Sequence, residues 1–494
     1  MLQVCNGYVT LPGMSTDQPN HAPLVLILIA GIGATSALIG GYWDDAWHTE
    51  HGRDSFLIAP HIATYAGIAA AGAALTGWGL LVAYRNGPQA VWAHKPLALG
   101  LIAVAVTLGS APADNLWHVA FGRDAVIWSP PHMLGIAGTL ALGAAVLAEV
   151  ASRRERWAAP ATVLAGAMVL TSAAFAAVEY ETDVPQFSEL WYLPALGLTA
   201  AIALAMIRTA SRLRWAATLS AAAYTALIGG VGLFLMALEF SPPALPLLVA
   251  PALAVDIAAR RAWSPAATGA AFAAVLYIVY VPVRNLLGDG VEISAGDVAV
   301  GLPLTALACA VVFAIAAGRV RWRRLAVATA ALVALALPGS AFGHDPGQGD
   351  PAGEVDLAVA LDGERATLTA ELARDACAET SPRAVVARRA GVTLRAPLEK
   401  RGCAFRGSLT LPERGRWFVY AEMERDGRTV ETWLPVSVGD GPARVAEDGR
   451  YAYFPPERSD SAVKVIAGAA LYAGMLALVV AAFALIRRST PAVS

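Results

Sequence analysis

Long apolar runs separated by short charged clusters limit what this chain can fold into. Of its 494 residues, 57% are hydrophobic and 15% are charged, whereas roughly 25% of the residues in a soluble domain are charged. Runs of about 20 apolar residues are long enough to cross a bilayer, and backbone polar groups in lipid force such runs to be helical. The sequence therefore predicts a mainly α, polytopic helical bundle whose partner is the lipid bilayer, and we expect no nucleic-acid partner.

About twelve transmembrane helices are predicted from these runs. They cover residues 23–42, 57–84, 96–113, 126–150, 157–179, 190–208, 215–239, 243–259, 264–283, 296–318, 324–342 and 463–486. The first four form two successive hairpins.

Basic residues occupy every second loop, and these loops are expected in the cytoplasm because cytoplasmic loops are rich in Lys and Arg. They are Arg85 and Lys95; Arg153, Arg154 and Arg156; Arg208, Arg212 and Arg214; Arg260 and Arg261; Arg319 to Arg324; and Arg487 and Arg488. Both chain termini are then cytoplasmic in a multi-pass protein of the cell membrane. The outer loops carry acids that we expect to be solvated or paired, with a proton or cation path as the alternative: Glu179, Glu181, Asp183 and Glu239.

A polar motif lies at the outer turn of each of the first two hairpins. The first reads Asp44-Asp-Ala-Trp-His48-Thr-Glu-His-Gly-Arg-Asp-Ser-Phe-Leu-Ile-Ala-Pro-His61. The second runs from Asp114 through His118 to His132, with Asp, Trp, His, Gly-Arg-Asp, Pro and His in the same order. Packing alone does not explain such a repeat inside an apolar sequence.

The spacing of the motif is that of a metal site. Asp44 and His48 are four residues apart, so they share one face of a helix, and His61 opens the next helix and can point back at them. Imidazole suits copper, zinc, iron and nickel, and a carboxylate completes a site with open positions. The same argument predicts a second set at Asp114, His118 and His132. Arg53, Asp54, Arg123 and Asp124 are candidates for outer partners that hold the ligands, and the alternative is that each Gly-Arg-Asp is a helix-linking turn with an ion pair.

Other histidines have weaker claims. His51 has no counterpart in the second repeat, so it is either a further ligand or solvated. His21 and His94 stand alone near helix ends and are expected at the membrane interface. His344 follows a stretch, 324–343, whose basic start, apolar middle and small-x-small end resemble a signal peptide. A metal at His344 would need its own N-terminal amine after cleavage, or an outside ligand.

Residues 344–460 change character. Short alternating segments broken by Asp-Gly turns are typical of strands, and about 100 residues of them suggest a small β-sandwich. Cys377 and Cys403 are the two cysteines of this region, and a disulfide between them is plausible outside the cytoplasm.

The chain then divides into five parts. These are metal-binding hairpins over 1–150, further transmembrane hairpins over 151–323, a signal-like transmembrane helix over 324–343, an extracytoplasmic β-sandwich over 344–460 and a C-terminal anchor over 461–494.

The first set, Asp-x3-His-x12-His with Trp-His and Arg-Asp around it, resembles the copper site in the C subunit of the particulate methane/ammonia monooxygenases. The second resembles the neighbouring copper site of that subunit, with Asp114 where Asn is usual. The resemblance covers about residues 23–150. It implies copper, ahead of zinc or iron, on both ligand sets. The β-domain is similar, at the level of fold, to sandwich modules of membrane-anchored copper-handling proteins.

Two functions remain open at this point. An oxygen-activating copper monooxygenase, an oxidoreductase, would hydroxylate a small apolar or amine substrate, together with other membrane subunits or as a homo-oligomer. A non-catalytic copper protein would take up, store or deliver the metal. A third hypothesis treats the motifs as structural turns in a transporter.

Overall fold

The computed structural model describes residues 20–51, 57–121, 127–182, 184–185, 187–287, 291–319, 350–439, 442–455 and 461–489, without the side chains of His118 and Val119. The signal-like segment at 324–343 and His344 lie outside these residues.

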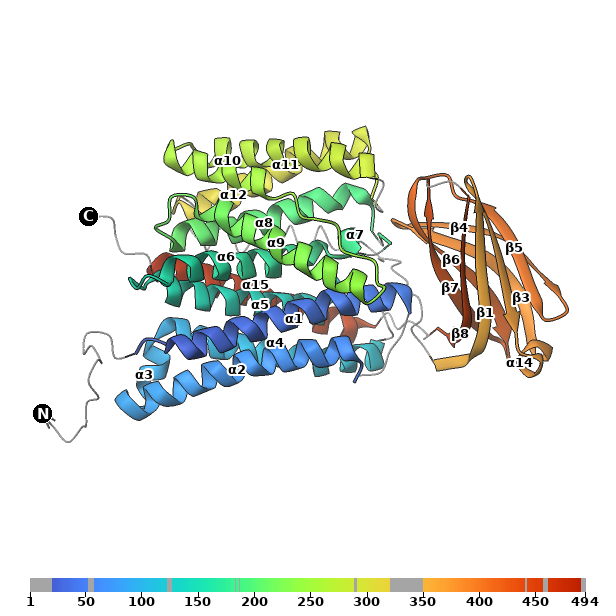
Figure 1. The fold of residues 1–494 in the computed structure, drawn as a ribbon, viewed down its shortest axis with the longest axis horizontal. Coiled ribbons are helices and arrows are strands. Elements are labelled where there is room, and N and C mark those ends of the chain that lie inside the picture. The colour runs from blue at the N-terminus through green and yellow to red at the C-terminus, as the bar shows by residue number, and fades with distance from the viewer. Residues whose placement is uncertain are drawn as a thin grey trace, which may run out of the picture.

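A helical bundle makes up most of the described chain (Figure 1). Ten of its helices are long and apolar enough to cross a membrane. They are α1 (Leu24–Glu50), α2 (Ala59–Asn86), α4 (Lys95–Phe121), α5 (Pro130–Ala151), α6 (Ala158–Ala174), α8 (Tyr192–Ala210), α9 (Ala216–Ala237), α11 (Pro265–Leu287), α12 (Ala295–Ala316) and α15 (Ala462–Ser489). Shorter helices are α3 (Pro88–Ala93), η1 (Phe175–Ala177), α7 (Glu179–Thr182), η2 (Glu189–Trp191), α10 (Val249–Arg260) and α14 (Arg374–Ala378).

The count of twelve spans is not reached in the described chain. The span expected at 324–342 lies outside it, and the one expected at 243–259 is broken. There α10 has 12 residues, or about 18 Å, which is short of the roughly 30 Å of a hydrocarbon core. Residues 240–248 before it are not helical. This stretch contains Pro242, Pro243 and Pro246, and proline lacks the backbone donor and disfavours helix in the residue before it.

The β-domain is a closed antiparallel barrel, so the expectation of a sandwich was wrong. Its strands are β1 (Asp350–Asp362), β2 (Arg365–Leu372), β3 (Thr380–Arg389), β4 (Val392–Arg401), β5 (Ala404–Thr410), β6 (Gly415–Arg425), β7 (Arg428–Val438) and β8 (Ala443–Phe454). They close in the order β1-β2-β5-β4-β3-β6-β7-β8, because β1 pairs with β2 on one side and with β8 on the other. In both architectures strands alternate between a buried and an outer face, so the pattern alone does not distinguish them.

Apolar side chains fill the barrel, among them Val359, Phe405 and Trp417, each fully buried. Cys377 on α14 and Cys403 in the turn between β4 and β5 form a disulfide, with their Cα atoms 5.3 Å apart. The disulfide joins the small helix to the barrel wall.

The barrel lies beyond one end of the bundle, next to the end of α1 and to α7, as Figure 1 shows. At the opposite end α1 begins and α15 finishes. The basic residues that follow α2, α5, α8 and α10 gather at that opposite end, because each of these helices runs away from the barrel.

Replacing Cys377 with Ser is expected to lower the free energy of unfolding of the barrel by about 3 kcal/mol, because a cross-link over a loop of this size restricts the unfolded chain. Its two cysteines are 26 residues apart. Hydrogen exchange of the barrel strands in the full-length protein measures the loss. Reductant should reproduce it in the wild type and add nothing in the variant. Equal exchange in the two proteins would show that the disulfide does not stabilise the barrel.

Candidate metal centre

Helices α1 and α2 pack with their backbones in contact, and this brings the first motif together. A Cβ atom added at Gly33 would lie 2.5 Å from the carbonyl oxygen of Gly67. One added at Gly40 would collide with Thr64. Glycine at these positions therefore lets the two helices approach closely, and the last turns of α1 face the first turn of α2.

Asp44, His48 and His61 meet at this junction. The Asp44 Oδ1 atom lies 3.0 Å from His61 Nε2 and 3.7 Å from His48 Nε2. The two imidazole rings have their centroids 6.4 Å apart. All three side chains are partly buried. The structure thus brings together all three ligands that the sequence predicts for the first set.

These atoms suit a single metal ion. One ligand atom from each residue lies within 4.8 Å of the other two. Metal–ligand distances of about 2.0–2.2 Å for imidazole and carboxylate require ligand atoms that lie near one another in this way. Two nitrogens and one carboxylate oxygen leave coordination positions open, and imidazole ligands favour copper, zinc, iron or nickel over calcium or magnesium.

The second motif is placed in the same manner. Asp114 lies on α4, and His132 lies in the first turn of α5, with Asp114 Oδ1 and His132 Nε2 3.3 Å apart. His118 stands one turn after Asp114 on α4, but its side chain is outside the described atoms. Two of the three predicted ligands of the second set are therefore in contact.

The two hairpins also share their packing. Gly40, four residues before Asp44, faces Thr64, three residues after His61. At the equivalent places of the second hairpin are Ser110 and Gly135, and a Cβ added at Gly135 would lie 2.7 Å from Ser110 Oγ. The glycine lies on the first helix of the first hairpin and on the second helix of the second, but both pairs make the same close contact. The repeat in sequence is thus a repeat in structure.

The two sets are neighbours in space. Helix α2 packs against α4, and a Cβ added at Gly100 would lie 3.3 Å from the Leu75 side chain. The Asp44 carboxylate interacts electrostatically with His132 of the second hairpin. The two candidate sets therefore belong to neighbouring hairpins.

Not every predicted site residue joins the ligands. His51 is exposed, and its ring packs against Trp47 and Phe240, with centroids 5.0 and 5.2 Å away. It is not among the grouped metal-binding side chains of the described chain. The expected outer partners Arg53, Asp54, Arg123 and Asp124, like His344, lie outside the described residues.

Sequence reasoning missed how α7 connects these elements. Glu179 and Glu181, expected to be solvated or paired, are buried and paired. Glu179 accepts a hydrogen bond from the backbone of Ile127, just before α5, and Glu181 accepts one from the Tyr192 hydroxyl at 3.3 Å.

The next residue of α7 reaches the first motif directly. The Thr182 hydroxyl donates to the carboxylate of Asp45, the neighbour of Asp44. The two residues are 137 positions apart in the chain, so no local pattern could have indicated this contact.

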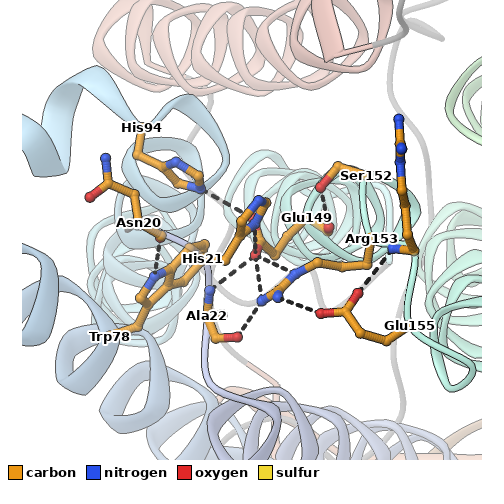
Figure 2. A network of polar contacts seen from close by, with 10 residues as sticks. Asn20, His21, Ala22, Trp78, His94, Glu149, Ser152, Arg153 and Glu155 are labelled. Carbon is orange, nitrogen blue, oxygen red and sulfur yellow. Dashed lines mark hydrogen bonds and ion pairs between the residues drawn. The ribbon is translucent and has the colours of Figure 1, made fainter. Parts of the chain in front are cut away.

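A second polar cluster lies where α1 and α4 begin and α5 ends, at the opposite end of these helices from the two motifs (Figure 2). The Glu149 carboxylate on α5, 3% exposed, lies 2.8 Å from His21 Nδ1 and 3.1 Å from His94 Nε2. Arg153 lies 3.0 Å from the same carboxylate, and the backbone of Ala22 donates to it at 3.0 Å. His21 and His94, expected as isolated interfacial residues, therefore share one buried anion.

Comparisons with protein-family models, with curated proteins and with solved structures find no match to this chain.

Replacing Glu149 with Gln is expected to destabilise the bundle by about 3 kcal/mol, because removing one partner of a buried ion pair leaves the other charge uncompensated. The apparent melting temperature in detergent measures the loss. Glu155→Gln is the matched control, since the Glu155 carboxylate also lies 3.2 Å from Arg153 but is 47% exposed, and surface pairs contribute little. Equal melting temperatures for the two variants would contradict a holding role for Glu149.

Proposed function

We propose that this chain is a copper-binding membrane protein. The observation that carries the proposal is the convergence of Asp44, His48 and His61 on one small volume, together with the contact between Asp114 and His132 at the equivalent place. The resemblance of both motifs to copper sites of the membrane monooxygenases selects copper from the metals that imidazole suits.

The sites belong, in this proposal, to the outer side of the cell membrane. Most basic residues of the bundle, those in and just after the last turns of α2, α5, α8 and α10, lie at the end away from the barrel, and cytoplasmic ends of membrane proteins are rich in Lys and Arg. The disulfide in the barrel supports the same orientation, because disulfides persist in oxidising compartments. Barrel and metal centres lie at one end, so they share this side.

The reaction that we favour is oxygen-dependent hydroxylation of a small apolar or amine substrate, in which one oxygen atom of O2 enters the substrate and the other leaves as water with two electrons and two protons from an external reductant. Copper held by two imidazoles and a carboxylate, with open positions, supplies the redox chemistry for such a reaction. The chain itself offers access from lipid: Leu57, just before α2, and Ile62, in its first turn, are 71% and 52% exposed. An apolar substrate dissolved in the bilayer could reach His61 across this surface.

A second candidate function is copper uptake, storage or delivery without turnover. The partial exposure of Asp44, His48 and His61 favours it, because ligands near solvent let an ion enter and leave. The same three residues serve both functions.

Metal analysis of the purified protein tests copper binding. Wild type loaded with Cu(II) and then desalted is expected to retain copper, and His48→Ala and His61→Ala are each expected to lose the ion of the first set. His51→Ala is the matched control, because His51 is close in sequence but packs away from the ligands. Unchanged copper stoichiometry in both ligand variants would overturn the proposal.

Turnover separates the two functions. In the presence of an added reductant, membranes that contain the wild type should consume additional oxygen when a short alkane or a simple amine is supplied, and His48→Ala membranes should not. If the protein binds copper without such consumption, and a deletion strain becomes sensitive to copper, handling of the metal is the function.

A further inference from the structure

The barrel touches the end of the helix that carries two of the metal ligands. Arg450 of β8 donates from Nη1 to the backbone carbonyl oxygen of Glu50 at 2.9 Å. Its side chain is 2% exposed. Glu50 is the last residue of α1 and stands two positions after His48. The last carbonyl groups of a helix lack partners within it, and a cation there also interacts favourably with the helix dipole.

A second arginine of the barrel reaches the Glu50 side chain. Arg416 of β6 places Nη2 3.9 Å from the Glu50 carboxylate. The same nitrogen donates to Ser241 Oγ at 2.9 Å. The Glu50 carboxylate in turn accepts a hydrogen bond of 2.7 Å from the Ser241 backbone. The Glu50 side chain is thus held between the barrel and the chain that follows α9.

The same arginine connects to the other side of His48. Arg416 Nη1 donates to the carbonyl oxygen of Thr182 at 2.9 Å, and the Thr182 hydroxyl donates to the Asp45 carboxylate. Asp45 precedes His48 by three residues, and Glu50 follows it by two. The contacts that start from the barrel therefore bracket the turn of α1 that bears Asp44 and His48.

We infer that the barrel is a clamp on the metal-bearing turn of α1, with Arg416 and Arg450 as its positioning residues. The inference rests on the proposed function, because it concerns the affinity and geometry of that site. His61 is placed by the glycine contacts of α1 with α2. The clamp fixes Asp44 and His48 against it. Both arginines act through other groups and lie outside the ligand set.

Coupling of this kind is reciprocal. If docking of the barrel raises the affinity of the site for copper, then copper must stabilise docking of the barrel by the same free energy. Metal loading should therefore be detectable in the barrel strands, although the ion is held by helices.

The test compares arginines of one barrel that differ in their reach. Arg416→Gln, Arg450→Gln and the double variant remove the clamp. Arg389→Gln is the matched control: the Arg389 side chain is 0% exposed and lies 2.5 Å from the Glu189 carboxylate, so this ion pair joins the barrel to η2 of the bundle. Copper affinity is measured by competition with a chelator on the full-length protein in detergent, and the electron paramagnetic resonance spectrum of bound Cu(II) reports ligand geometry.

The double variant is expected to bind Cu(II) at least ten-fold more weakly, as for other residues that hold metal ligands from outside, and with a changed spectrum. Arg450→Lys should bind Cu(II) more tightly than Arg450→Gln, because lysine keeps the positive charge. Arg389→Gln should lower the melting temperature and leave the spectrum as in the wild type. An unchanged affinity and spectrum in the double variant would overturn the clamp.

Hydrogen exchange on the wild type completes the test without any variant. Addition of Cu(II) should slow exchange both at the end of α1 and in β8 around Arg450, and slowing confined to the helices would overturn the clamp. The two proposals fail separately. Copper retained after His48→Ala and His61→Ala refutes the metal site itself. If copper is lost in these variants but the Cu(II) affinity is unchanged in the arginine variants, the clamp alone is refuted.

Discussion

Every backbone polar group in the bundle needs a partner from the protein, and this requirement explains its most irregular part. Residues 240–248 are irregular within a bundle otherwise built of helices, and such backbone is tolerated in a membrane where protein surrounds it. Here the backbone of Ala244 donates to the Glu181 carbonyl oxygen at 2.7 Å, and that of Leu247 donates to the Tyr280 hydroxyl at 3.0 Å. The buried polar groups around α7 therefore have a structural reason, and they lie beside the end of α1 that carries Asp44 and His48.

Much of the fold could be predicted because its signals are local. Apolar length predicts the helices, and the repeated motif predicts the meeting of Asp44, His48 and His61, since the spacing of Asp44 and His48 places both on one helix face. Closure of the barrel could not be predicted, because it depends on pairing between β1 and β8, the first and last strands of the domain. Pro242, Pro243 and Pro246 indicate the break before α10, but the apolar composition around them favoured a continuous helix in the prediction.

Contacts between distant segments could not be predicted from the sequence either, because they also depend on tertiary packing. Glu149 gathers His21 from 128 positions away, and Arg450 meets the end of α1 across 400 positions. A buried charge must be paired, but its position in the sequence does not identify the partner. In the folded protein, histidines and arginines that are isolated in the sequence belong to two polar networks.

These two networks hold α1 at its opposite ends. At one end Glu149 ties the beginnings of α1 and α4 to the end of α5. At the other, Glu50 and Asp45 tie the end of α1 to the barrel and to α7. Between them the glycine contacts set the spacing of α1 and α2. In the proposed metal site, ligands held in this way would lose little freedom on binding an ion, because most of the ordering has occurred during folding, and preorganisation of this kind increases affinity without any new contact.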